Sequence, residues 1–293
     1  MEEGRASRTA EYMALFRALE SARPARQRLF QDPFAVLFLR PRLRLVVAVS
    51  RLPRLGGVVR RYLDTRWPGA RTSGAARTRF IDDAVIAALG TGIAQVVILG
   101  AGFDARPYRL RALAAATVFE VDHPSTSAAK RRALARGGVA PPAHVRFVAV
   151  DLAAAALGTA MRNAGYDPGR PTLFVWEGVT NYLTAEAVDE TLRWCARAAA
   201  GSAIVFTYVH RRVLEAPEAF EGTRALFATL GAAHERWTFG LDPAELARYL
   251  GDRGLALEED VGAADYRARY FGPVADGMRG YEFYRIAVAR RRA

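Results

Sequence analysis

Gln95-Val-Val-Ile-Leu-Gly-Ala-Gly-Phe-Asp104 reads as a buried strand that breaks into a Gly-x-Gly turn, and Val118-Phe-Glu-Val-Asp122 reads as a second strand ending in an acid. Glycine lets the backbone turn sharply and approach a ligand closely, because no β-carbon intervenes. Asp122 follows Gly100 by 22 residues, a spacing at which an acid accepts hydrogen bonds from a ribose diol. The stretch therefore predicts a sheet that binds an adenosyl cofactor.

A plain strand-to-helix turn is the alternative interpretation of this stretch. The third glycine of the dinucleotide fingerprint is missing, because Ala105 and Arg106 follow Asp104. The two glycines therefore need support from other motifs before they indicate a ligand.

Strands and helices alternate along the rest of the chain. Strands that are apolar throughout are typical of a parallel sheet covered on both faces, so we expect a doubly wound α/β fold. The last two expected strands could form a hairpin that adds an antiparallel strand. The expected strands cover residues 96–99, 118–121, 145–150, 172–176, 203–208, 255–261 and 283–289.

Helices are expected before the first strand and between later strands. The spacing of apolar residues predicts two or three short helices in 9–39, a helix over 77–89 and another over 243–250. Residues 40–79 hold eleven arginines and one acid, which predicts basic amphipathic helices or a lid. We expect residues 265–280 to be irregular, with the aromatic side chains of Tyr266, Tyr270, Phe271 and Tyr281 available to line or cover a pocket.

The charge of the chain is concentrated near its N-terminus. The 293 residues carry a formal charge of +12, and residues 1–80 hold 17 arginines against 6 acidic residues. We interpret the excess as either a solvated helical surface over a cleft or a surface for an anionic substrate or acidic partner. No nucleic-acid motif accompanies the arginines, and the apolar runs are too short to span a bilayer. Neither nucleic acid nor a membrane is therefore expected as a partner.

Location and cysteine content give two further expectations. The N-terminus lacks the basic-then-apolar order of a secretory signal, so a cytoplasmic protein is expected. The single cysteine, Cys195, lies in a helical apolar pattern and is expected to be a small buried thiol. No cysteine cluster indicates a metal, and no metal site is expected.

Charged residues follow several of the expected strands. Asp122 ends the second strand, Asp151 and Leu152 follow the third, and Glu177 follows the fourth. Ligands bind at the carboxyl edge of a doubly wound sheet, so these residues are expected to meet there. An acid suits a ribose, an adenine amino group or an ammonium, and the guanidinium of Arg77 suits a carboxylate. Together these groups describe S-adenosyl-L-methionine.

Five ordered motifs resemble the leucine carboxyl methyltransferase family, particularly its bacterial small-molecule O-methyltransferase branch. They are Arg77-Thr-Arg-Phe-Ile-Asp-Asp83, Gln95 to Arg106, Phe119-Glu-Val-Asp-His-Pro124, Val150-Asp-Leu152 and Trp176-Glu-Gly-Val-Thr-Asn-Tyr-Leu-Thr184. The resemblance implies a Rossmann-like class I methyltransferase fold, with an antiparallel C-terminal strand and an N-terminal helical lid. It further implies a lid or substrate segment over 1–79 and a methyltransferase domain over 80–293, with a substrate-capping insertion around 209–240.

The resemblance also assigns roles to single residues. Arg77 is implied to pair with the cofactor carboxylate, and Gly100 to support its methionine portion. Asp122 is implied to hold the ribose and Glu177 the amino group. The adenine is implied to lie against Asp151 and Leu152. Arg17 is implied, on a looser alignment, as a second cation for the carboxylate.

The reaction implied is methyl transfer to an oxygen atom of a small-molecule or carrier-bound natural-product intermediate in secondary metabolism. Such a displacement chiefly requires alignment and the exclusion of water, and an ionised carboxylate acceptor needs no general base. A phenol needs one, and the candidates are Tyr182, Tyr208 and His210, with His123 and His234 also considered. No catalytic base is assigned.

Two other functions are alternatives to methyl transfer: a nicotinamide-dependent oxidoreductase and a non-catalytic cofactor-binding regulatory module. The oligomeric state is left open.

Overall fold

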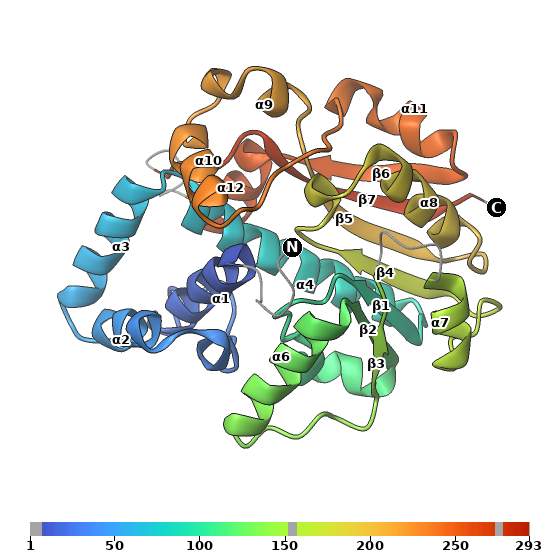
Figure 1. The fold of residues 1–293 in the computed structure, drawn as a ribbon, viewed down its shortest axis with the longest axis horizontal. Helices are drawn as coiled ribbons and strands as arrows, with labels where there is room; N and C mark the ends of the chain where they lie inside the picture. Colours follow the sequence, from blue (N-terminus) through green and yellow to red (C-terminus); the bar gives the residue numbers. More distant parts are fainter. Residues whose placement is uncertain (1–7, 152–156, 273–277, 293) are drawn as a thin grey trace.

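A seven-stranded sheet forms the centre of the molecule in the computed structural model (Figure 1), which describes residues 8–151, 157–272 and 278–292. The strand order is β3-β2-β1-β4-β5-β7-β6, and β7 runs antiparallel to both of its neighbours. All the predicted strands are confirmed. Their bounds are β1 Gln95–Leu99, β2 Thr117–Asp122, β3 Val145–Ala149, β4 Thr172–Trp176, β5 Ala203–Val209, β6 Leu255–Val261 and β7 Tyr284–Arg291.

The two faces of the sheet carry separate hydrophobic cores, because alternate residues of each strand point to opposite sides. Val97 and Leu99 of β1 pack toward α8 (Ala185–Ala196) and α11 (Leu246–Gly251). Val96 and Ile98 pack on the other side, toward α4 (Ala70–Gly90) and α12 (Ala263–Phe271). The central strands are buried on both faces, which explains why their sequences are apolar throughout.

Further helices connect the strands or cover their carboxyl ends. Cys195 on α8 is a buried free thiol, as expected. Short 3-10 turns, such as η3 (Thr180–Tyr182) after β4 and η5 (Pro243–Glu245) before α11, complete the connections. The remaining α-helices of this part of the chain are α5 Arg106–Arg109, α6 Pro124–Arg136, α7 Leu157–Asn163, α9 Arg212–Glu215 and α10 Thr223–Ala232.

Two helices differ from the sequence-based expectation. The helix predicted from Arg77 begins at Ala70, because the small residues before Arg77 are buried in close contact with α1 (Arg8–Ser21). Part of the segment predicted to be irregular, 265–280, is the helix α12. The carboxylate of Asp265 accepts a hydrogen bond from the N–H of Gly262 at 2.8 Å, which caps this helix.

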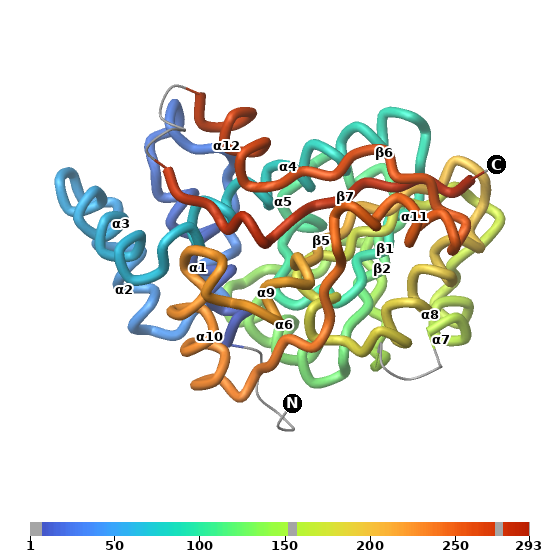
Figure 2. Tube along the Cα trace, turned by 90° about the horizontal axis from the view of Figure 1, so that it is seen from above, coloured from blue at the N-terminus to red at the C-terminus, as the bar shows by residue number. Residues whose placement is uncertain are grey.

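The N-terminal region forms a helical layer beside the sheet. It comprises α1, η1 (Ala35–Phe38), α2 (Pro41–Ser50) and α3 (Leu55–Arg66), which share a hydrophobic cluster with α6. In Figure 2, α2 and α3 project from the body at the end far from the C-terminus. The division at residue 79 stays a prediction, and α4 runs continuously across it. Among the described residues, no helix combines the length and the apolar character that crossing a membrane requires.

Candidate functional site

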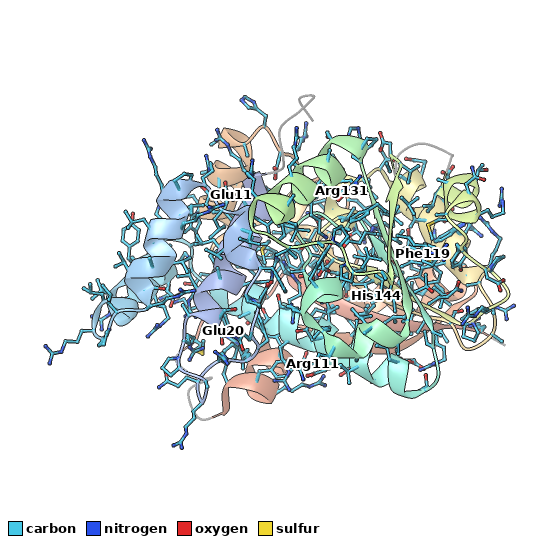
Figure 3. All side chains as sticks on the ribbon, turned by 90° about the horizontal axis from the view of Figure 1, so that it is seen from below. Glu11, Glu20, Arg111, Phe119, Arg131 and His144 are labelled. Carbon is cyan, nitrogen blue, oxygen red and sulfur yellow. The ribbon has the colours of Figure 1, made fainter. Side chains whose placement is uncertain are left out.

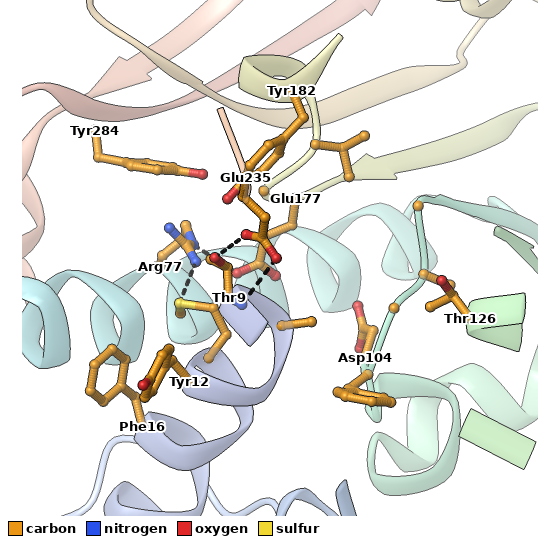
Figure 4. Close-up of a pocket in the computed structure, with 18 of the residues that line it drawn as sticks. Thr9, Tyr12, Phe16, Arg77, Asp104, Thr126, Glu177, Tyr182, Glu235 and Tyr284 are labelled. Carbon is orange, nitrogen blue, oxygen red and sulfur yellow. Dashed lines mark hydrogen bonds and ion pairs between the residues drawn. The ribbon is translucent and has the colours of Figure 1, made fainter. Parts of the chain in front are cut away.

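A cavity of about 490 Å³ lies over the carboxyl ends of the central strands, between the sheet and the N-terminal helices (Figure 4). Five of the six residues predicted to hold the cofactor line it. They are Arg77, Gly100, Asp122, Asp151 and Glu177. The sixth, Leu152, lies outside the described residues. The parallel strands bring the three acids to one edge, since each acid ends or closely follows its own strand, and α4 contributes Arg77.

The turn after β1 forms the floor of the cavity. Gly100 and Gly102 both adopt positive φ angles, 64° and 42°, which glycine adopts without steric cost. A β-carbon at Gly100 would collide with the side chain of Val179, so the position also requires glycine for space. The carboxylate of Asp122 accepts hydrogen bonds from the N–H groups of Gly102 and His123, the latter at 2.7 Å. Burial raises the pKa of Asp122, while these two bonds oppose that rise.

Arg77 and Glu177 form a largely buried ion pair in the wall of the cavity. Arg77 Nε donates to Glu177 Oε1 at 2.7 Å, and its guanidinium lies 4.6 Å from the centre of the Tyr284 ring. Figure 4 shows this stacking, with Arg77 between Tyr284 and Glu177. Burial alone would raise the pKa of Glu177, but Arg106 and Arg77 lower it to about 2. The site therefore presents one fixed cation and one fixed anion side by side.

Arg106 connects this pair to a network of buried charges. It contacts Glu177 Oε2 at 2.8 Å, Asp82 Oδ1 at 2.8 Å and Asp104 Oδ2 at 2.5 Å. Its side chain is only 3% exposed. Arg109 holds the other oxygen of Asp82 at 2.7 Å, and the network fixes the orientation of Glu177. Sequence reasoning missed this role of Arg106, although Asp82 and Arg106 both belong to the motifs quoted above.

Arg17 takes part in the same region of the site. It lines the cavity, donates to Asp32 at 2.9 Å and donates to the carbonyl of Phe103 at 2.6 Å. The bond to Phe103 anchors α1 to the turn after β1, and the bond to Asp32 anchors it to the residues before η1. The described contacts of Arg17 are therefore structural, and its implied role toward a cofactor carboxylate stays a prediction.

The three candidate bases occupy different environments. Tyr182 lines the cavity, whereas Tyr208 and His210 are absent from its described lining. The Tyr208 side chain is fully buried, and its hydroxyl donates to the carboxylate of Asp260 at 3.0 Å. His210 Nδ1 accepts a hydrogen bond from the N–H of Arg212 at 3.1 Å. Burial raises the pKa of both Tyr182 and Tyr208, so each keeps its proton at neutral pH.

Aromatic side chains form one wall of the cavity. They come from the N-terminal region, from η3 after β4, from the 209–240 segment, and from β7 and the residues just before it. They are Tyr12, Phe16, Trp67, Tyr182, Trp237, Tyr281 and Tyr284. Tyr12 and Trp67 pack together at 5.5 Å between ring centres. Four aromatic residues near the end of the chain were expected to line or cover a pocket, and of these only Tyr281 is in the described lining. The wall is therefore suited to a flat or apolar molecule.

Polar contacts fasten the N-terminal helices to α10 and the segment after it, above the cavity. Thr9 Oγ1 is hydrogen-bonded to Glu235, as drawn in Figure 4. Trp67 Nε1 donates to Thr229 Oγ1 at 3.0 Å, and Arg8 donates to the carbonyl of Ala232 at 3.0 Å. His123 and His234 also line the cavity. Within the described part of the chain, no group of three or more His, Cys, Asp or Glu residues is arranged to hold a metal ion.

Comparison with known proteins identifies the family to which this site belongs. A family model described as leucine carboxyl methyltransferase matches residues 10–196. A protein of Mycobacterium avium (strain 104), provisionally named an S-adenosyl-L-methionine-dependent methyltransferase, is 38% identical over 262 residues, covering 86% of this chain and 79% of that protein. A similarly named protein of Mycobacterium tuberculosis (strain ATCC 25177 / H37Ra) is 34% identical over 285 residues, covering 92% of this chain and 78% of that protein.

Solved structures agree on the fold. The crystal structure of a provisionally named methyltransferase from Thermobifida fusca YX matches with a TM-score of 0.60 at 20% identity, covering 94% of this chain and 97% of that one. A DUF574 family protein from Streptomyces avermitilis also matches with a TM-score of 0.60, at 17% identity and 99% coverage of both chains. The chain therefore belongs to the leucine carboxyl methyltransferase family and is a methyltransferase that uses S-adenosyl-L-methionine.

Proposed function

We propose that the enzyme transfers a methyl group to an oxygen atom of a small-molecule acceptor, and that this oxygen belongs to a carboxylate. One observation carries the proposal: a buried Arg77–Glu177 pair, two strand-end carboxylates and an aromatic wall all face a single cavity. The charged side suits the cofactor and the aromatic side suits an acceptor with an apolar body. The description of the matching family, which names carboxyl methylation, also supports a carboxylate.

In this proposal, each charged residue binds a different group of the cofactor. Arg77 binds the carboxylate of the methionine portion, and Glu177 binds its ammonium, so the ion pair of the free protein is replaced by two pairs with the ligand. Asp122 accepts from the ribose hydroxyls, and Asp151 accepts from the adenine amino group. Gly100 lets the backbone approach the methionine portion closely.

The cofactor supplies a methyl group on a sulfonium, which is displaced in line by the acceptor oxygen. The carbon–sulfur bond breaks as the carbon–oxygen bond forms, and a carboxylate gives a methyl ester with no proton to remove. The enzyme then has to align the acceptor and exclude water. The protonated state of the buried Tyr182 suits this reaction, because a carboxylate needs no base from the wall.

A transfer assay with labelled methyl groups tests the proposal. We expect transfer to members of a panel of aromatic and apolar carboxylic acids, at a rate that is flat between about pH 6 and 9 because the acceptor is ionised throughout. Tyr182→Phe should change kcat by no more than about threefold, whereas loss of a general base costs about 10²–10⁴-fold. Transfer confined to phenols, with a rate that rises with pH and collapses in Tyr182→Phe, would contradict the proposal.

A further inference from the structure

Exposed apolar side chains gather on the segment 40–66, which contains α2 and α3 and which we call the basic hairpin. Of the six large hydrophobic side chains that are exposed among the described residues, five belong to it: Leu45, Leu52, Leu55, Val58 and Tyr62. Val58 and Tyr62 are 63% and 66% exposed. Leu55, Val58 and Tyr62 are spaced by three and four residues, so they share one face of α3. Clustered exposure of this kind marks an interaction site.

The basic hairpin is also strongly charged, and of its arginines only Arg40 has an ion pair among the described residues, with Glu11. It contains eight arginines against one acid, Asp64. Arg42, Arg51, Arg54 and Arg61 are exposed and form no ion pair with any residue that the structure describes. In Figure 3 the side chains on the outer side of these helices extend into open space.

Some exposed arginines of the main body form ion pairs, whereas others, such as Arg111, Arg132 and Arg197, form none with the described residues. Arg193 lies 2.8 Å from Asp189, Arg269 lies 2.5 Å from Glu259, and Arg290 lies 2.6 Å from Glu258. Each of these pairs neutralises a charge on the surface of the main body. The basic hairpin is distinguished by the combination of its charge, eight arginines against one acid, with its exposed apolar side chains. Such a surface attracts an acidic partner that also offers apolar contacts.

The position of the basic hairpin connects this surface to the active site. Its second helix, α3, ends at Arg66, and the next residue, Trp67, lines the cavity. A helix of twelve residues spans about 18 Å, so a partner seated along α3 stands beside the cavity wall. A molecule bound to the hairpin is thus placed to deliver an acceptor to the site.

From these observations we propose that the basic hairpin docks an acidic carrier protein, which presents the acceptor to the cavity. The inference rests on the proposed methyl transfer. A second copy of this chain is disfavoured, because its own hairpin would bring a like-charged surface. A membrane surface is the alternative occupant, since interfacial helices carry basic residues and leucine, although the exposed side chains described for the hairpin include no tryptophan or phenylalanine.

Binding is tested with a purified bacterial holo-acyl carrier protein, labelled with a fluorophore and titrated with the enzyme by anisotropy. We expect saturable binding that weakens as salt is raised. The charge-reversal variant R42E/R51E/R61E should bind at least about tenfold more weakly, and so should the polar variant L55S/V58S/Y62S. The control R111E/R132E/R197E changes the same charge at exposed positions elsewhere and should bind within about twofold of wild type.

Other occupants of the surface are tested in parallel. Vesicles of equimolar phosphatidylglycerol and phosphatidylcholine are sedimented with each variant, and sedimentation velocity reports self-association. Absence of carrier binding, or binding that R42E/R51E/R61E leaves intact, would overturn the inference. Hairpin-dependent binding to vesicles or to a second copy, without carrier binding, would overturn it as well.

The methyl-transfer assay separates this inference from the proposed function. The variant R42E/R51E/R61E alters no cavity residue, so its transfer to a free carboxylate acceptor should match that of the wild type. Lost docking with intact transfer to the free acceptor supports the inference. An enzyme that methylates free carboxylates but does not bind the carrier would contradict only the docking inference. An enzyme that binds the carrier but transfers no methyl group to any carboxylate would contradict the proposed function.

Discussion

Replacing Arg106 by methionine is expected to lower the free energy of unfolding by about 3–5 kcal/mol, because it leaves buried carboxylates without their shared cation. Arg106 contacts Asp82, Asp104 and Glu177, all within 2.8 Å. Methionine restores much of the volume but none of the charge, so the loss reports electrostatics and not a cavity. Urea unfolding followed by circular dichroism at neutral pH measures the change.

The same variant has a predictable pH dependence. Glu177 has a pKa of about 2 in the folded protein, below its ordinary value of 4.5, because the nearby arginines outweigh the effect of burial. An acid with a lowered folded pKa stabilises the fold while ionised, so its contribution is full above about pH 4.5 and is lost as the pH falls toward 2. The difference between wild type and Arg106→Met should therefore shrink as the pH falls below about 4.5.

An exposed arginine provides the control for this experiment. Arg290 also forms an ion pair, with Glu258, but its side chain is 42% exposed. Arg290→Met should lose no more than about 1 kcal/mol, since exposed pairs contribute little. If Arg106→Met were as stable as Arg290→Met, the buried network would not have the role assigned to it.

Replacing Glu177 by glutamine is expected to weaken cofactor binding by about 1.5–3 kcal/mol, or about ten- to a hundredfold, because a hydrogen bond to a charged group is lost. Glutamine keeps the shape of the side chain but removes the charge that is proposed to face the ammonium. It also leaves Arg77 with a weaker partner, 2.7 Å away in the wild type. Equilibrium dialysis with labelled S-adenosyl-L-methionine measures the affinity.

A carboxylate outside the cavity is the matched control for Glu177. Asp260 forms an ion pair with Arg285 at 2.9 Å and has a similarly covered side chain, 13% exposed against 16% for Glu177. Asp260→Asn should leave cofactor affinity within about twofold of wild type, because sites without shared partners act independently. Equal weakening by both substitutions would indicate a general loss of structure and not a specific contact.

The sheet could be predicted from the sequence because its signal is local. Central strands such as β1 and β4 are apolar after their first residue, and the acids at the ends of β2 and β4 are brought to one edge by parallel topology. The first turns of α4 were missed, because Thr72, Ser73 and Gly74 have low helix propensity, and Gly74 packs against α1. The helix α12 was missed because its cap depends on Asp265 and a glycine.

The site was only partly predictable, because side-chain pairing across the fold has no local signal. Arg77 and Glu177 were each assigned to the ligand, yet 100 residues of sequence separate them and the fold places them in contact. Tyr208 follows the expected pattern of a strand-end group, but Asp260 and Arg285 from β6 and β7 enclose its hydroxyl. Those late strands insert beside β5, and their register could not be inferred from the sequence.

Isothermal titration calorimetry with S-adenosyl-L-methionine, on the wild type and on Asp122→Ala, measures most directly whether the strand-end groups form the cofactor site. We predict a binding heat for the wild type and an affinity lower by about 1–3 kcal/mol, or about five- to a hundredfold, in Asp122→Ala. Asp260→Asn should bind as the wild type does. Unchanged affinity in Asp122→Ala would contradict the site, and so would binding of a nicotinamide dinucleotide by a wild-type protein that gives no heat with S-adenosyl-L-methionine.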